Sequence, residues 1–403
     1  MKSGSMHILV INSGSSSVKF SIFSAISGHD PEPVVDGSVS GIGTADATLE
    51  IRHVGVPRVN PVKVGAKNSL EAIRLVLDEV SKPEIPHLDA IGYRVVHPGP
   101  KLNRHQRITD IVLADLEAAV VFAPLHDPDA IHLIREAMHR FPDIPHYACF
   151  DTIFHQTMPA SATTYPIPAR FRAQGVRRYG FHGLSCESVV RQLDAAAIRP
   201  ERMVIAHLGS GCSVTALRDG KSVDTTMGLT PTGGVVMGTR PGDLDPGLIF
   251  YLLREDGATV DSVEHMLNHE AGIKALFGVN DMQKLRDAAA TGDERAKLAA
   301  EIFTSSVRRA IGGMAALHGL DALVFTGGIG EHDAVSREEI AGGLWQSQPI
   351  VDPILNTSPG NGIRKISSDA SATPVYIVPA EEDWMIAIHV SQMAASASAN
   401  GRI

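Results

Sequence analysis

Short apolar runs alternate with amphipathic segments along most of this chain. Runs of the length expected for buried strands lie at 7–11, 89–96, 146–150, 203–208, 321–326 and 375–378. Apolar residues at helical spacing predict helices over 69–80, 112–122, 130–140, 186–197, 295–318 and 382–394. The stretch 31–66 is richer in glycine, proline and β-branched residues, so we expect short antiparallel strands and turns there. This alternation is typical of an α/β protein.

Two stretches half a chain apart share one design. Residues 10–20 and 205–215 each contain an apolar strand, a small polar turn with glycine, and a second strand. The repetition predicts two related domains, each of which presents a turn to something bound between them. The alternative is two ordinary tight hairpins without a common role.

Composition narrows the class of protein. A chain of 403 residues has room for two or three domains, and with 44% hydrophobic and 20% charged residues it is expected to fold. Its net charge of −9 argues against general binding to a nucleic-acid backbone. Cys149, Cys186 and Cys212 are too few and too far apart for a disulfide framework, which favours a reducing compartment. Because the apolar run 6–11 is short and no run reaches the ~18 residues that cross a bilayer, we expect a cytoplasmic protein without a membrane partner.

Loops rich in glycine and hydroxyl groups follow several of the predicted strands. Residues 12–17 place small polar side chains around Gly14, and Lys19 lies two residues into the next strand. Glycines also follow the run 321–326, and others precede Arg240. Backbone N–H groups in such loops can cradle an anion, although a solvated serine-rich turn is the alternative for the first loop. Together the loops favour a nucleotide or another phosphate-bearing ligand.

Two arginines lie where an ordinary surface charge is not expected. Arg94 is within the apolar stretch 92–97, where an unpaired guanidinium would be costly, so it needs an anionic partner. Arg240 is in a loop of glycine, threonine and proline rather than on a helix face. A structural ion pair is the alternative to a functional role for each.

Several histidines and carboxylates have two interpretations each. His126 and His182 lie in apolar, turn-flanked settings that suit a core histidine or a catalyst. The His126–Asp127 pair leaves a metal-dependent phosphohydrolase open, although the chain has no H-E-x-x-H or paired C-x-x-C motif. Asp151 ends the run 146–150 and is either a site carboxylate or a helix N-cap. Residues 381–383 either complement a helix dipole or hold Mg²⁺ together with substrate phosphates.

Eight segments, in order along the chain, resemble those of the acetokinase family. They are 10–20, 94–97, 123–126, 150–159, 178–183, 227–231, 237–243 and 325–331. The resemblance implies the fold shared by acetate and sugar kinases, heat-shock protein 70 and actin: two ribonuclease-H-like domains with a nucleotide cleft between them. On this basis we expect a first domain over 6–150, a second, nucleotide-binding domain over 151–383, and a helix over 384–396 that packs back on the first. The family also implies a homodimer.

The reaction that the resemblance implies is the reversible transfer of the ATP γ-phosphoryl group to acetate, which gives acetyl phosphate and ADP. Mg²⁺ or Mn²⁺ would be required, held by Asn12 and Glu382. Since a carboxylate nucleophile is ionised near neutral pH, no strong general base is needed. We therefore expect Asp151 to orient a metal ion or Arg240 rather than to abstract a proton.

Carried over position by position, the family's site falls on residues that are far apart in the sequence. Arg94 would bind the substrate carboxylate, and the catalytic set would be Asp151, His182, Arg240 and Arg94. The acyl pocket would be formed by Val96, Leu125, His126, Phe181 and Pro231. The phosphates and the nucleotide would contact Lys19, His207, Leu208, Gly209, Ser210, Gly211, Asp281, Met282, Gln283, Gly328, Ile329, Gly330, Glu331 and His332.

The chain departs from the family pattern at positions that bear on its substrates. Ser210 replaces a usual asparagine and Gln283 a usual arginine, which leaves ATP, GTP and pyrophosphate open as donors. Tyr93 replaces histidine, and Asp127 stands where asparagine is common. One methylene in an apolar pocket is worth only about 1–3 kcal/mol, so acetate and propionate both stay open. The alternatives are a propionate or butyrate kinase and, in another class, a non-catalytic nucleotide-binding module.

Overall fold

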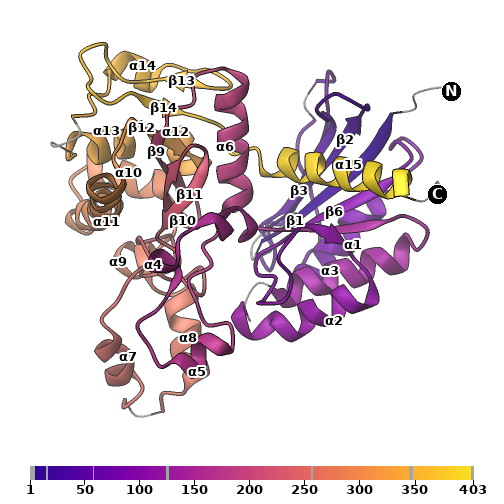
Figure 1. Ribbon diagram of the computed structural model, residues 1–403, viewed down its shortest axis with the longest axis horizontal. Coiled ribbons are helices and arrows are strands. Elements are labelled where there is room, and N and C mark those ends of the chain that lie inside the picture. The colour runs from indigo at the N-terminus through magenta and orange to yellow at the C-terminus, as the bar shows by residue number, and fades with distance from the viewer. Residues whose placement is uncertain are drawn as a thin grey trace. The chain divides into compact units, whose positions relative to one another are not determined.

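The computed structural model describes residues 5–14, 17–57, 59–123, 127–255, 257–344 and 348–400, and the side chains of these residues up to 397. The chain divides into two compact units, Met1–Ile153 with Glu381–Ile403 (unit 1) and Phe154–Ala380 (unit 2). Each unit contains one β-sheet, and helices lie beside both sheets (Figure 1). The mixed α/β class expected from the sequence is confirmed.

The sheet of unit 1 combines antiparallel hairpins with parallel strands. β1 pairs antiparallel with β2 and parallel with β6, and β6 pairs parallel with β8. In spatial order the strands are β5 (Val62–Lys63), β4 (Thr48–His53), β3 (Glu32–Ser40), β2 (Ser17–Ala25), β1 (Met6–Ser13), β6 (Ala90–Val95), β8 (His146–Phe150) and β7 (Gln106–Arg107). The short antiparallel strands predicted within 31–66 are therefore confirmed.

Four helices accompany this sheet: α1 (Ser69–Glu79), α2 (Asp110–Ala119), α3 (Asp127–Arg140) and α15 (Glu382–Asn400). The predicted N-cap Asn68 accepts a hydrogen bond from the backbone N–H of Glu71, which starts α1. The C-terminal helix α15, yellow in Figure 1, lies against β1, β2 and β6. A Cβ at Gly92 of β6 would lie 2.8 Å from Cγ2 of Ile386, so only glycine allows α15 to approach this strand so closely.

The sheet of unit 2 repeats the central arrangement of the first. Its strands lie in the order β11 (Lys221–Thr225), β10 (Cys212–Arg218), β9 (Arg202–Leu208), β12 (Ala322–Thr326), β14 (Val375–Ile377) and β13 (Arg364–Lys365). The series β11-β10-β9 is antiparallel, and β12 and β14 run parallel to β9, as β6 and β8 run parallel to β1. The repeat predicted from 10–20 and 205–215 is thus confirmed as two hairpins at matching places in matching sheets.

The helices of unit 2 differ more from expectation. They are α4 (Ala160–Thr163), α5 (Ala169–Ala173), α6 (Gly183–Ala195), α7 (Pro246–Leu252), α8 (Val260–His269), α9 (Gly272–Phe277), α10 (Met282–Ala290), α11 (Glu294–His318), α12 (Gly327–His332), α13 (Ala334–Gly342) and α14 (Pro353–Thr357). Short 3₁₀ turns occur at Val120–Phe122 and Ile153–Thr157. The six predicted helices and six predicted strands are confirmed. The helices that were not predicted, α4, α5, α7 to α10 and α12 to α14, are short segments of 4 to 10 residues. In the described part of the chain, no helix has the length and apolar character needed to cross a membrane.

Candidate active site

Arg94 in β6 is a partly buried cation of unit 1, and its predicted need for an anionic partner is confirmed. Its Nε donates to Oδ1 of Asp151 at 3.1 Å, and its Nη2 donates to Oδ2 of the same carboxylate. β6 and β8 are parallel neighbours, so Arg94 and the residue that follows β8 meet at one edge of the sheet. Burial opposes the charge on Arg94, but Asp151 and then Glu382 more than offset it and raise the pKa of the guanidinium. From the sequence we expected Asp151 to orient a metal ion or Arg240, whereas its hydrogen bonds in the structure include two from Arg94.

Asn12, at the end of β1, joins this pair to the start of α15. Its Oδ1 accepts from Nη1 of Arg94 at 3.3 Å, while its Nδ2 faces Glu382 and Asp383, each at 3.4 Å. Oε2 of Glu382 also lies 3.8 Å from Nε of Arg94. The pKa of Asp383 is raised by burial and by the charge of Glu382. Asn12 and Glu382, which we assigned to the metal, therefore lie together although 370 positions separate them.

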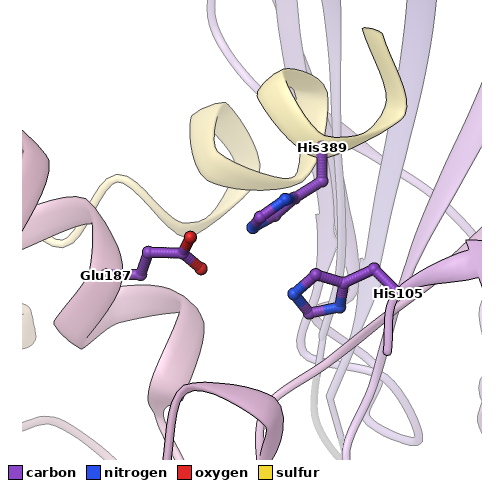
Figure 2. Close-up of side chains that lie close together, drawn as sticks. All are labelled: His105, Glu187 and His389. Atoms are coloured by element: carbon purple, nitrogen blue, oxygen red, sulfur yellow. The ribbon is translucent and has the colours of Figure 1, made fainter. Parts of the chain in front are cut away.

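A pair of histidines lies next to Phe150, the last residue of β8, which directly precedes Asp151. Figure 2 shows His105 beside His389 of α15, with ring centroids 4.1 Å apart. Nδ1 of His105 accepts a 3.0 Å hydrogen bond from the backbone N–H of Phe150, so the neutral ring carries its proton on Nε2. Burial and the neighbouring His389 lower the pKa of His105 to about 3. A metal-ligating histidine donates from its second ring nitrogen. His105 accepts there instead, so the pair suits a structural role that fixes the end of β8.

The glycine loops of unit 2 lie at the ends of two adjacent parallel strands, β9 and β12. Thr326 pairs with His207 in this ladder. Gly327 has a φ of +78°, and a Cβ there would lie 2.8 Å from the carbonyl oxygen of Leu208, so the two loops touch backbone to backbone. A Cβ added at Gly209 would lie 3.9 Å from the backbone nitrogen of Gly328. Two of the three segments predicted to contact nucleotide, 207–211 and 328–332, are therefore neighbours.

Two stacked histidines stand beside the first of these loops. The rings of His182 and His207 have centroids 4.1 Å apart and lie within 19° of parallel. Nδ1 of His182 lies 2.9 Å from Oγ of Ser213, and Nδ1 of His207 lies 2.8 Å from Oγ of Ser185. The hydroxyl groups fix the orientation of both rings. Sequence reasoning missed both serines, because each lies 22 or 31 positions from its histidine and only the fold brings the two together.

Gly211 marks the point where His182 and Arg240 approach each other. A Cβ at this glycine would lie 3.2 Å from Nε2 of His182 and 3.6 Å from Nη1 of Arg240. Nη1 of Arg240 also donates to the carbonyl oxygen of Pro231 at 3.0 Å. The backbone of Arg240 is itself held closely, since a Cβ at Gly272 would lie 2.6 Å from its carbonyl oxygen. Two side chains that we predicted to stabilise the transition state thus point to one glycine.

The third predicted nucleotide segment, 281–283, begins α10. Asp281 is the N-cap of this helix, and Gln283 bonds along it to Asp287 at 2.9 Å. One turn later, Arg286 donates to Oδ2 of Asp333 at 3.2 Å, just past 328–332. This ion pair ties the second and third segments together. A cavity of about 510 Å³ lies beside them, lined by Arg286, Ala289, Ala290, Ala300, Val335 and Glu339 among others.

The residues predicted to form the acyl pocket are divided between the two units. Val96 is buried in unit 1, and Phe181 and Pro231 are buried in unit 2. Leu125 and His126 lie outside the described residues. Lys19 of β2 is exposed in unit 1, and His332 at the end of α12 is exposed in unit 2.

Comparison with known proteins assigns the chain to a family. The acetokinase family matches residues 7–388. The chain belongs to the acetokinase family. Over 401 residues it is 42% identical to the acetate kinase of Nitrobacter hamburgensis, with 95% of each chain covered. It is 39% identical over 398 residues to that of Geobacillus kaustophilus, covering 96% of this chain and 99% of the relative.

Solved structures of acetokinases agree with the fold described above. The crystal structure of Porphyromonas gingivalis acetate kinase is similar with a TM-score of 0.83 at 30% identity, covering 96% of this chain and all of that one. A propionate kinase from Francisella tularensis has a TM-score of 0.87 at 35% identity, with the same coverage. This chain therefore has the actin-like ATPase fold of its family, as the resemblance implied.

Proposed function

We propose that this protein is an acetate kinase, which transfers the γ-phosphoryl group of ATP reversibly to acetate by direct in-line transfer. The observation that carries the proposal is the partly buried Arg94, held by Asp151 at the end of adjacent parallel strands. Membership of the acetokinase family supports it.

Arg94 is suited to bind a small carboxylate. Of its five N–H donors, three are used by Asp151 and Asn12 in the described structure. Its side chain keeps 17% exposure, so the remaining donors are reachable. Bidentate contact with a guanidinium is a strong way to hold a carboxylate. Asp151 fixes the guanidinium, and no proton needs to be removed from acetate.

The groups of unit 2 are suited to the phosphoryl group. The transferred phosphoryl carries negative charge spread over its oxygens, and donors placed in advance stabilise it. Arg240 and His182 provide such donors beside Gly211. We propose that they act on the same phosphoryl group that acetate attacks, and that the two units close over the ligands to exclude water.

The residues at the start of α15 fit a magnesium ion. Mg²⁺ prefers oxygen ligands from one or two carboxylates together with substrate phosphates. Glu382 offers a carboxylate, to which Nδ2 of Asn12 donates, and Asn12 offers its amide oxygen, which also accepts from Arg94. We propose that these two residues hold Mg²⁺ or Mn²⁺, which neutralises charge on the nucleotide phosphates when bound.

Several finer assignments belong to this proposal. The stretches 207–211, 281–283 and 328–332, together with Lys19, bind ATP. The cavity of about 510 Å³ receives part of the nucleotide.

The methyl group of acetate is enclosed by Val96, Leu125, His126, Phe181 and Pro231. Propionate is the second candidate acyl substrate, favoured by the similarity to a propionate kinase structure. We also propose a cytoplasmic homodimer, supported by three buried cysteines that are far apart in the sequence and by exposed Phe250 and Tyr251 on α7.

A hydroxylamine trap tests the function, because hydroxylamine converts an acyl phosphate into a hydroxamate. We expect hydroxamate only when ATP, Mg²⁺ and acetate are all present. Replacing acetate by propionate or butyrate, and ATP by GTP or pyrophosphate, ranks the substrates. Phosphate release without any carboxylate would identify a phosphohydrolase instead. Nucleotide binding without either product would identify a binding module.

Arg202→Ala is a matched control for the Arg94→Ala variant in this assay. Arg202 pairs with Asp321 on the surface, 2.6 Å apart and partly exposed. Its loss removes one guanidinium without touching the candidate site, so hydroxamate formation should persist in Arg202→Ala and fall in Arg94→Ala. Equal activity of the two variants would contradict the assignment of Arg94.

A further inference from the structure

Asp127, the first residue of α3, is a buried carboxyl group that the proposed reaction does not use. Its exposed fraction is 1%. Oδ1 accepts a 3.3 Å hydrogen bond from the backbone N–H of His97, whereas Oδ2 is buried and has no hydrogen-bond partner in the described part of the chain. An ionised carboxylate with an unpaired buried oxygen is costly, so this geometry favours the neutral acid.

The surroundings of Asp127 add to this preference. The groups that act on it include His97, which follows β6, and Asp151, which follows β8. Asp151 is itself paired with Arg94 of β6. Burial raises the pKa of Asp127 to about 8, the hydrogen bond from His97 opposes the shift, and the charge of Asp151 adds to it.

The position of Asp127 connects two parts of the proposed acyl site. Its partner His97 directly follows Val96, and Asp127 directly follows the segment 123–126. The charge that acts on it belongs to Asp151, which holds the proposed carboxylate-binding Arg94. A negative charge on Asp127 would therefore arise close to where a second anion must bind.

We propose that Asp127 is a specificity-determining residue of the carboxylate-substrate site, which accepts the anionic substrate when Asp127 is a neutral acid and repels it when Asp127 is ionised. This inference rests on the proposed function. The neutral acid preserves the link between His97 and α3 without adding charge. Ionisation places a carboxylate beside Asp151 and offsets the positive potential of Arg94, so the substrate anion binds less tightly.

The test is the pH dependence of KM for acetate between pH 6.5 and 9.5, with ATP and Mg²⁺ saturating and ADP formation followed. Acetate is ionised throughout this range, so its own titration does not interfere. With a pKa of about 8, the wild type should show a KM for acetate that rises about tenfold between pH 7 and 9. The Asp127→Asn variant keeps an acceptor for His97 but cannot ionise, and its KM should stay flat. Neither kcat nor the KM for ATP should separate the two proteins.

Asp129→Asn is the matched control. Asp129 lies in the same first turn of α3, and its carboxylate accepts from Oγ of Ser69 at 2.9 Å instead of facing Asp151. This variant removes one charge from the same helix end and should retain the wild-type rise in KM. A rise that persists in Asp127→Asn, or that disappears equally in Asp129→Asn, would overturn the proposal.

The wild-type protein alone also decides the question if Asp127→Asn fails to fold. A KM for acetate that is constant between pH 7 and 9 would refute the inference while leaving acetate kinase activity intact. Absence of ADP formation with acetate or propionate at any pH would refute the proposed function, and the inference with it.

Thermal unfolding gives an independent readout. Because the folded-state pKa of Asp127 lies above its ordinary value, the wild type should lose stability as pH rises from about 4 to about 8. Asp127→Asn should lack this loss, so the difference in Tm between the variant and the wild type should widen with pH. A difference that does not change with pH would count against a neutral Asp127.

Discussion

The two units use a guanidinium group in contrasting ways. In unit 1, Arg94 is surrounded by carboxylates: two of its nitrogens bond to Asp151, and Glu382 lies within ion-pair distance. In unit 2, the hydrogen bonds of Arg240 include one to the backbone carbonyl of Pro231, and its neighbour at Gly211 is His182. Arg94 thus belongs to a network of carboxylates, whereas the hydrogen bonds of Arg240 include one to a neutral carbonyl group.

The different partners of Arg94 and Arg240 predict different effects on protein stability and on catalysis when each is removed. A buried ion pair that loses one member leaves the other charge uncompensated, which destabilises the fold strongly. Removing a guanidinium that donates to a carbonyl oxygen leaves that oxygen as a polar group that water can satisfy. We therefore expect Arg94 to affect both folding and catalysis, and Arg240 to affect catalysis alone.

The largest effect is expected for Arg94→Ala. It should lower kcat/KM for acetate by about a thousandfold or more, because the substrate carboxylate loses its partner. It should also lower the free energy of unfolding by about 3 kcal/mol, since the fully buried Asp151 loses its ion pair with Arg94. Steady-state kinetics and urea denaturation measure the two effects. An unchanged unfolding free energy would show that the carboxylate network does not depend on this arginine.

The next effect is expected for Arg240→Ala. Loss of a donor to the phosphoryl group should lower kcat by about a hundredfold to a thousandfold. The free energy of unfolding should change by no more than about 1 kcal/mol. If Arg240→Ala unfolded as readily as Arg94→Ala, the contrast between the two units would be wrong.

A smaller effect is expected for Ser213→Ala. The hydroxyl lies 2.9 Å from Nδ1 of His182 and fixes the ring. Its loss should lower kcat about tenfold with little change in KM for acetate, because the proposed partner of His182 is the phosphoryl group. Ser213→Thr, which restores a hydroxyl, should recover part of the loss. A defect confined to KM for acetate would contradict the proposed role of His182 at the phosphoryl group.

The smallest effect concerns acid stability in unit 1. Since the folded-state pKa of His105, about 3, lies below its ordinary value, the protein should lose stability as pH falls from about 6.5 towards 3. His105→Asn retains an acceptor for the N–H of Phe150 and should reduce this loss by about 1–2 kcal/mol. Denaturant unfolding at pH 7 and pH 5 measures the difference. An identical loss in the variant would assign the acid sensitivity to other groups.

The sequence predicted the strands, the repeat and the anionic partner of Arg94, because these follow from local periodicity and from the cost of an unpaired buried charge. The resemblance to the acetokinase family placed Asn12 and Glu382 at one metal ion, and the structure brings them together. The sequence did not predict the hydroxyls of Ser185 and Ser213 beside the histidines, because those contacts join residues on different elements and only tertiary packing brings them together. Neither could the burial of Asp127 be predicted, since a charged residue at the start of an amphipathic helix is ordinarily exposed.

The central claim is that Arg94 and Arg240 act on one reaction centre. A crystal structure of the protein with ADP, Mg²⁺, acetate and a planar phosphate mimic tests it directly. We predict that the Arg94 guanidinium donates to acetate and that the Arg240 guanidinium donates to the adjacent mimic, within one enclosed ligand assembly. A complex in which either guanidinium lies beyond hydrogen-bond distance of every bound ligand would contradict the account.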